Sequence, residues 1–166
     1  MEPVPDPATD PAGFVRATQA EVRRFVAALV DPGTADDLTQ ETYLRAFRGL
    51  GEFAGRSSTR TWLLAIARHV CADHIRTVQR RRRLDARLPE PEPVPDPAGL
   101  VGAMDLLREL PDERREAFVL TQLVGLSYEE AAAACEVALG TIRSRVARAR
   151  MQLVAAATVD RAGTFR

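Results

Sequence analysis

Hydrophobic residues recur at helical spacing along most of the chain, and the alternating or β-branched runs that strands need are few. In the first half, this pattern predicts three helices, over residues 14–30, 35–49 and 61–83. Asp31-Pro32-Gly33 ends the first helix, because proline and glycine both disfavour its continuation. A polar loop over residues 51–59 separates the second helix from the third.

Two of these helices carry a recognisable apolar side. In the second helix, the apolar side is predicted to consist of Leu38, Tyr43, Leu44 and Phe47. In the long third helix, the predicted buried stripe consists of Leu63, Ile66, Ala67, Val70, His74 and Val78. The opposite face of that helix carries Arg68, His69, Ala72 and Arg76. A basic run, Arg80–Arg83, continues the polar side, so the sequence predicts a phosphate-binding surface here.

Residues 89–97 read PEPEPVPDP, with proline at every second position. Neither a helix nor a sheet tolerates this spacing, so an extended linker is predicted. The linker divides the chain into two domains, each followed or preceded by a tail. The predicted order is tail, domain, linker, domain and tail, over residues 1–12, 13–87, 88–98, 99–157 and 158–166. The first tail, rich in proline, is predicted to be disordered.

The second domain is predicted to contain helices over residues 99–110 and 112–124, followed by two more. Pro111 suits the start of the helix over 112–124, and Gly125 suits its end. Residues 127–151 then predict two short helices joined by a tight turn. Ser127 can cap the first of them, and Glu130 completes a capping box.

The last of these helices has two distinct faces. At about 100° per residue, its buried stripe consists of Ile142, Val146, Ala149 and Leu153. The opposite face is small and mostly uncharged at its centre and has arginines along its edges. Such a face suits a recognition helix, whose centre approaches base edges while its rim meets phosphates. The alternative, a solvated arginine-rich surface, is disfavoured because acidic residues are not interleaved.

Composition supports an all-α fold of two small helical domains. Aromatic residues make up 5% of the chain, and the 166 residues are dominated by Ala, Leu, Arg and Glu. The formal net charge of zero conceals strong segregation of charge. Residues 60–87 and 137–166 are rich in arginine, whereas residues 88–136 are acidic. Two basic segments favour two salt-sensitive contacts with nucleic acid.

The sequence offers no candidate for catalysis or for a cofactor. A Gly-rich phosphate loop and a Ser/His/Asp grouping are both missing, so no enzyme activity is expected. His69, Cys71 and His74 point in different directions on a helix and are not expected to share a metal. Cys71 and Cys135 are expected to be small buried hydrophobic residues. With neither a signal peptide nor a membrane-length apolar run, a cytoplasmic protein is expected.

Three segments, in this order, resemble the extracytoplasmic-function sigma factors of bacterial RNA polymerase, over roughly residues 13–157. DDLTQETYLRAF (Asp36–Phe47) is similar to the core-polymerase-binding segment, and RSSTRTWLLAIARHVCADHIR (Arg56–Arg76) to the minus-10 recognition and melting segment. LRELPDERREAFVLTQLVGLSYEEAA and GTIRSRVARAR are similar to the minus-35-binding region. The pattern resembles most the actinobacterial sigma-C-type branch of the family.

The resemblance implies a role for each matching residue. The residues implied to meet the clamp helices of the polymerase β′ subunit are Asp37, Gln40 and Glu41. Those implied for minus-10 DNA are Ser57, Ser58, Thr59 and Arg60, which capture an extruded base, with Arg68, His69 and Arg76 along the same strand. Those implied for minus-35 DNA are Thr141, Arg143, Ser144, Arg145 and Arg148. From the residues alone, the default explanation of Asp36, Asp37 and Glu41 is negative charge that complements the helix dipole.

The implied partners are the RNA polymerase core, through its β′ clamp helices and β flap, promoter DNA, and an anti-sigma factor. The chain departs from the family pattern at His69, at Ala138 and Ala147, and at Thr121, where some members carry a DNA-contacting arginine. The minus-10 and minus-35 sequences therefore do not transfer from relatives. The alternative hypothesis is a helix-turn-helix regulator that binds an operator without polymerase, which needs a dimerisation stripe that the sequence does not display.

Overall fold

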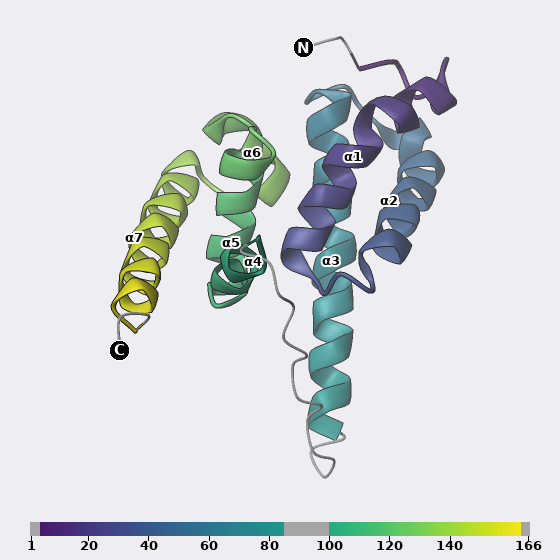
Figure 1. The fold of residues 1–166 in the computed structure, drawn as a ribbon. Coiled ribbons are helices and arrows are strands. Elements are labelled where there is room, and N and C mark those ends of the chain that lie inside the picture. Colours follow the sequence, from purple (N-terminus) through teal and green to yellow (C-terminus); the bar gives the residue numbers. More distant parts are fainter. Residues whose placement is uncertain (1–3, 85–99, 164–166) are drawn as a thin grey trace.

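A computed structural model describes residues 4–84 and 100–163, and the regular secondary structure of these stretches is entirely helical (Figure 1). Its elements are α1 (Pro11–Leu29), α2 (Ala35–Gly49), a 3-10 turn η1 (Leu50–Glu52), α3 (Thr59–Leu84), α4 (Leu100–Arg108), α5 (Asp112–Phe118), a π-helical turn η2 (Val119–Leu123), α6 (Tyr128–Cys135) and α7 (Leu139–Gly163). The prediction of an all-α fold is confirmed. The predicted linker over residues 88–98 lies outside the described residues.

The first half of the chain is a bundle of α1, α2 and α3. Asp10 caps α1 by accepting a hydrogen bond of 2.8 Å from the backbone N–H of Gly13, and Pro11 occupies the first turn. The side chains of Phe14, Val22, Phe25 and Val26 on α1 are fully buried. The hydroxyls of Thr18 and Tyr43 lie 2.7 Å apart within this core and satisfy one another. The bundle therefore has a compact apolar core that fixes α1 against α2.

The predicted apolar side of α2 is partly wrong. Tyr43 is buried, but Leu44 is 51% exposed and Phe47 is 38% exposed. Thr39 and Thr42 face the core instead, because each hydroxyl donates a hydrogen bond of 2.7 Å to a backbone carbonyl one turn earlier. With its polar group satisfied inside the helix, threonine packs like a small apolar residue, and two large apolar side chains are left on the surface.

The buried face of α3 is wider than the predicted stripe. Leu63, Ala67 and Val70 are buried as predicted, and Leu64 and Cys71 are buried beside them. The reason is that α3 packs against α1 and α2 on one side and against α6 on the other. From Gln79 onward, the side chains of α3 are exposed, and the end of the helix projects from the packed body (Figure 1).

The second half of the chain contains the predicted helix-turn-helix. Ser127 and Glu130 form the predicted capping box at the start of α6, with bonds of 3.1 and 2.8 Å. Gly125 has a φ of 80°, a conformation that glycine adopts without strain, and it follows the end of η2 as predicted. Glu136, with a φ of 55°, ends α6 and turns the chain into α7.

The predicted faces of α7 are confirmed over its first turns. Ile142, Val146 and Ala149 are buried, and Leu153 is half-buried against α4 and α5 residues. On the opposite face Ser144, Ala147 and Arg148 are exposed. The buried stripe thus holds the helix on α5 and leaves the arginine-edged face free to meet a ligand.

The two halves pack into one body. Helix α6 lies against α3, and α1 contacts α4, α5 and η2. Buried residues of both halves, from Phe14 and Leu64 to Leu120 and Ala131, form a continuous apolar cluster. Because of this packing, some of the predicted minus-10 residues on α3 point toward the second half of the chain.

The capping box yields a stability prediction. Ser127→Ala removes the acceptor for the Glu130 backbone N–H and is expected to lower the free energy of unfolding by about 1 kcal/mol. Guanidinium denaturation followed by circular dichroism measures this loss. The matched control is Ser144→Ala on the exposed face of α7, for which a change below about 0.5 kcal/mol is expected. Equal losses in both variants would contradict a capping role.

Candidate nucleic-acid interface

The exposed face of α7 gathers the predicted minus-35 residues. Arg143, Ser144 and Arg148 are exposed, and Thr141 is half-buried at the start of the helix. A shallow groove lies between this face and the start of α5, and Thr141, Ser144 and Arg148 line it. The Ser144 hydroxyl donates a 2.9 Å hydrogen bond to the Thr141 carbonyl. The structure therefore brings these residues together on one surface that is open to a DNA groove.

Arg145 differs from the other arginines of this face. Its guanidinium lies 2.6 Å from the Glu113 carboxylate on α5, and its side chain is 17% exposed. An arginine held in this way supports the orientation of α7 on α5. To contact a phosphate, Arg145 has to exchange Glu113 for the new partner.

Thr121 stands at a position where some members of the family are expected to contact DNA. Its side chain is buried here, and its hydroxyl donates a 2.8 Å hydrogen bond to the Ala117 carbonyl.

The loop before α3 carries the predicted base-capturing residues. Ser58 caps α3 by accepting a 3.1 Å hydrogen bond from the Thr61 backbone N–H. Ser57 and Thr59 are half-buried beside it. Arg60 is more enclosed, because its Nε lies 3.0 Å from both Glu21 carboxylate oxygens and its Nη2 donates 2.7 Å to the Val124 carbonyl of the second half. The loop is therefore part of the contact between the two halves.

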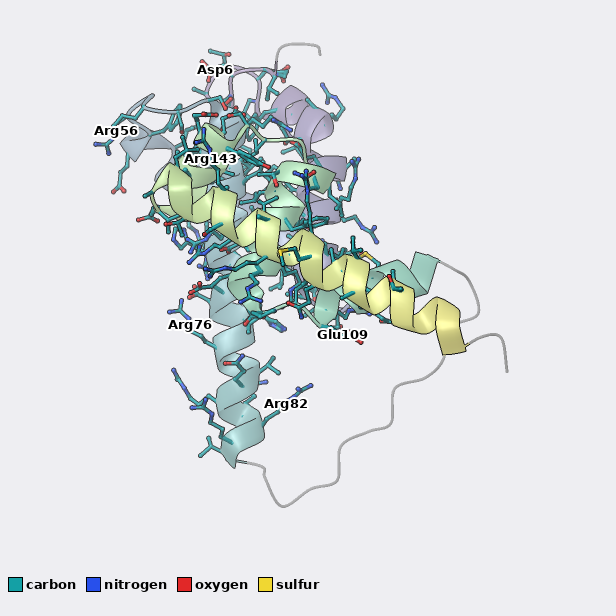
Figure 2. The ribbon with its side chains drawn as sticks, turned by 90° about the vertical axis from the view of Figure 1, so that its left-hand side faces the viewer. Asp6, Arg56, Arg76, Arg82, Glu109 and Arg143 are labelled. Carbon is teal, nitrogen blue, oxygen red and sulfur yellow. The ribbon has the colours of Figure 1, made fainter. Side chains whose placement is uncertain are left out.

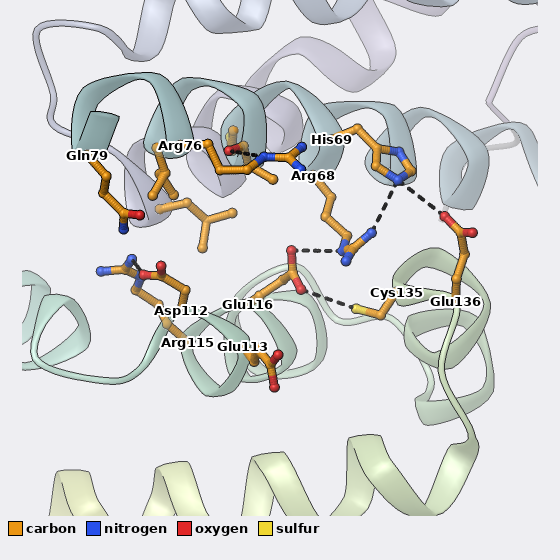
Figure 3. A pocket seen from close by; sticks show the side chains of 14 residues that line it. Arg68, His69, Arg76, Gln79, Asp112, Glu113, Arg115, Glu116, Cys135 and Glu136 are labelled. Atoms are coloured by element: carbon orange, nitrogen blue, oxygen red, sulfur yellow. Dashed lines mark hydrogen bonds and ion pairs between the residues drawn. The ribbon is translucent and has the colours of Figure 1, made fainter. Parts of the chain in front are cut away.

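The sequence predicted that Arg68 lies on an open face of α3, and this prediction is wrong. Its side chain is 21% exposed, and its Nε lies 2.8 Å from Glu116 Oε1 on α5. His69, at the edge of this contact, lies 3.2 Å from the Glu136 carboxylate (Figure 3). The helical angle placed Arg68 correctly on α3, but α6 packs against that side of the helix and Glu116 of α5 pairs with Arg68 there. Arg76, further along, is exposed and pairs with Asp73 at 2.6 Å.

The Arg68–Glu116 pair is a half-buried charge contact with incomplete hydrogen bonding. Burial raises the pKa of the Glu116 carboxyl, while the positive charge of Arg68 acts to lower it. The Nε–H of Arg68 is not aligned for a hydrogen bond despite the short distance. Desolvation offsets much of the attraction in such a pair, so the contact orients the halves more than it stabilises them.

A cavity lies between α3 and the α5–α6 corner (Figure 3). Arg68, His69 and Arg76 line it from α3, and Glu113 and Glu116 line it from α5. The Glu116 carboxylate thus faces Arg68, for which the resemblance implies a contact with the minus-10 strand, whereas Glu113 pairs with Arg145 on α7.

The predicted core-binding residues lie on the outer face of α2. Asp37 and Gln40 are exposed, whereas Glu41 is half-buried and pairs with Arg45 at 2.8 Å. Gln40, Leu44 and Phe47 follow one another at four and three residues, so they share one face of the helix. The exposed Leu44 and Phe47 therefore add an apolar component that sequence analysis assigned to the core. The sequence did contain a signal for this exposure, because Leu44 and Phe47 follow the polar Gln40 at helical spacing.

The described residues carry neither a metal-binding group nor a membrane-spanning helix. In residues 4–84 and 100–163, His, Cys, Asp and Glu side chains nowhere gather in threes in a way that could hold a metal ion. Within the same part of the chain, no helix combines the length and the apolar character needed to cross a bilayer.

Comparisons with known proteins match both halves. Residues 14–82 match the family described as Sigma-70 region 2, and residues 101–153 match Sigma-70, region 4. The curated ECF RNA polymerase sigma factor SigC of Mycobacterium tuberculosis (strain CDC 1551 / Oshkosh) is 54% identical over 154 residues, which cover 89% of this chain and 83% of the relative.

Two solved structures are similar across both halves. The sigma factor RpoE in complex with the anti-sigma factor NepR, from Bartonella quintana, gives a TM-score of 0.81 at 30% identity and covers 92% of this chain and 99% of that one. CnrH in complex with the cytosolic domain of CnrY gives a TM-score of 0.71 at 26% identity and covers 89% of this chain and 86% of that one.

The two buried thiols provide a chemical test of the packed arrangement. Cys71 and Cys135 both line the cavity, and burial raises the pKa of each thiol to about 12. Because the thiolate is the reactive form, alkylation by iodoacetamide at pH 8 is expected to be at least about 100-fold slower than in urea. Mass spectrometry of timed samples measures both rates. Labelling of either cysteine in buffer at its rate in urea would contradict the packing.

Proposed function

The chain belongs to the extracytoplasmic-function RNA polymerase sigma factors, and on this premise we propose which of its side chains meet the polymerase and the promoter. Its function is to direct core polymerase to promoters through regions 2 and 4, and it is not an enzyme. The observation that carries the residue assignments is the clustering of the matched positions on three separate surfaces, on α2, on α3 with its preceding loop, and on α7.

The α2 surface is the proposed core-binding site. Asp37 and Gln40 supply polar and negative groups, and the exposed Leu44 and Phe47 supply an apolar anchor on the same helix. A contact with an apolar centre and a charged rim is typical of protein interfaces. We assign this surface to the β′ clamp helices. A β-flap contact and an anti-sigma partner stay predictions from the resemblance.

The α7 surface is the proposed minus-35 reader. Arg143 and Arg148 extend from exposed positions on either side of Ser144. Because the small residues Ser144 and Ala147 lie between them, the helix can approach the base edges closely. Thr141 and Arg145 complete the surface near the turn between α6 and α7, where we expect them to contact the phosphate backbone of the DNA.

The loop from Ser57 to Arg60 and the adjacent face of α3 are the proposed minus-10 reader. In the described arrangement, Arg60 and Arg68 are occupied by Glu21, Val124 and Glu116. Separation of the two halves releases Arg68 from Glu116 and Arg60 from the Val124 carbonyl. Arg60 also has to exchange Glu21, on α1 of its own half, for the DNA strand. We propose that binding to core polymerase supplies this separation, since two tethered readers then act on one DNA molecule.

Run-off transcription tests the function itself. Core polymerase with this protein is expected to produce discrete start sites on a pool of genomic promoters, and core polymerase alone is not. The mapped starts give the minus-10 and minus-35 sequences. Absence of new starts despite demonstrated core binding would contradict promoter recognition by these surfaces.

Arg148→Ala tests the minus-35 reader. Loss of one base or phosphate contact is expected to lower minus-35-dependent transcription about 5- to 150-fold, because such contacts contribute about 1–3 kcal/mol. Core affinity, measured by fluorescence anisotropy, is expected to remain unchanged. Arg16→Ala, an exposed arginine on α1, is the matched control and is expected to leave transcription unchanged. Equal loss of transcription and core binding would refute the assignment.

Asp37→Arg tests the core-binding surface. A positive charge facing basic clamp helices is repulsive by several kcal/mol, so core affinity is expected to fall at least about 100-fold. The matched control, Asp6→Arg, reverses an exposed carboxylate on the N-terminal segment and is expected to bind core normally. Unchanged affinity of the Asp37 variant would remove this residue from the interface.

A further inference from the structure

Four charged side chains form a row of ion pairs across the surface between α2 and α3. Arg45, on α2, has its Nε 2.8 Å from Glu41 Oε1 and its Nη1 2.8 Å from Asp73 Oδ2 on α3. The other carboxylate oxygen of Asp73 lies 2.6 Å from Arg76 Nη2. We name these four residues the charge row. Its two carboxylates balance its two guanidinium groups.

Asp73 holds the central place in the charge row, because each of its two carboxylate oxygens meets a different arginine. Hydrogen bonds from Arg45, and after it from Arg76, hold the pKa of the Asp73 carboxyl below its ordinary value. The carboxyl group is therefore ionised at neutral pH. Neither Asp73 nor Arg45 has a role in the three surfaces proposed above.

The pairing fixes both the direction and the charge of Arg76. Its Nη2 meets Asp73, and its Nε donates a 3.3 Å hydrogen bond to the Ala72 carbonyl. The Arg76 side chain is 67% exposed, and Figure 2 shows it projecting from the surface of α3. Toward the described parts of the chain its Nη1 forms no hydrogen bond, so this nitrogen is available to a DNA strand. Arg76 is thus presented in one direction with much of its charge already balanced.

The charge row lies wholly within the first half of the protein. The contacts of Arg60 and Arg68 with the second half end when the halves separate, whereas the charge row depends on α2 and α3 alone. Exposed ion pairs such as these contribute little to the stability of a fold. Their consequence is therefore expected in how Arg76 meets DNA and not in whether the protein folds.

We propose that Asp73 is a specificity-determining residue of the minus-10 reader, which acts by balancing the charge of Arg76 and fixing its direction. The inference rests on the proposed function, in which Arg76 lies along the minus-10 strand. An unpaired arginine binds the phosphates of any sequence, and such a contact carries no sequence information. Asp73 weakens this general attraction and leaves the contact that Arg76 makes when the strand is correctly placed.

Holoenzyme binding to two fluorescent fork-junction DNAs tests the proposal. One DNA carries the minus-10 sequence mapped by run-off transcription, and the other carries the same bases scrambled. Asp73→Asn is expected to lower the ratio of the two affinities about 2- to 5-fold, the range of an exposed charge pair. On the scrambled DNA, the slope of log affinity against log salt is expected to steepen by about 0.7, the share of one single-strand phosphate contact. Asp73→Glu keeps the charge and is expected to keep both values.

Two further variants separate this role from a general effect of charge. Asp105→Asn breaks a pair of the same spacing, in which Arg108 Nη1 lies 2.7 Å from Asp105 Oδ1 on α4, and it changes the net charge equally. This matched control is expected to keep both the affinity ratio and the salt slope. In a protein that carries Arg76→Gln, Asp73→Asn is also expected to have no effect, because Asp73 acts through Arg76.

Three results would overturn the proposal. They are an unchanged affinity ratio in the Asp73→Asn variant, an equal change in the Asp105→Asn control, and an undiminished effect of Asp73→Asn beside Arg76→Gln. Failure of the proposed function looks different, because the unmodified holoenzyme would then bind the mapped and the scrambled DNA equally.

Discussion

The contact between Arg68 on α3 and Glu116 on α5 determines whether the proposed minus-10 reader is covered or accessible. Two further contacts join the halves, from Arg60 to the Val124 carbonyl and from His69 to the Glu136 carboxylate. Every one of these contacts uses a side chain from the proposed minus-10 reader. The same side chains therefore either hold the halves together or bind a DNA strand, and they cannot do both.

The contact between the two halves has the physical properties expected of a packed arrangement that opens when DNA binds. A continuous apolar cluster crosses the interface, yet the Arg68–Glu116 pair beside it is partly desolvated and imperfectly hydrogen-bonded. Such pairs contribute orientation at modest net stability. The acidic segment that separates the two basic ones in the sequence thus has a structural role, because Glu116 pairs with Arg68 on α3 and Glu113 pairs with Arg145 on α7.

Local features could be predicted from the sequence, and features of long-range packing could not. The capping box at Ser127 and the buried stripe through Ile142 depend on neighbours within one or two turns, and both are confirmed. The exposure of Leu44 depends on Thr39 and Thr42 taking core positions with their hydroxyls bonded inside the helix. The burial of Arg68 depends on α5 and α6, which lie far along the chain. Helical periodicity gives the direction of a side chain but not what covers it.

The distance between α1 and α7, free and bound to polymerase, tests the central claim most directly. Spin labels attached at Arg16→Cys and Met151→Cys, both exposed positions, report this distance by double electron–electron resonance in a chain carrying Cys71→Ala and Cys135→Ala. The account predicts one short distance in the free protein and a longer one in the holoenzyme on promoter DNA. An identical distance in both states would contradict the account, because the minus-10 reader would then remain covered while it acts.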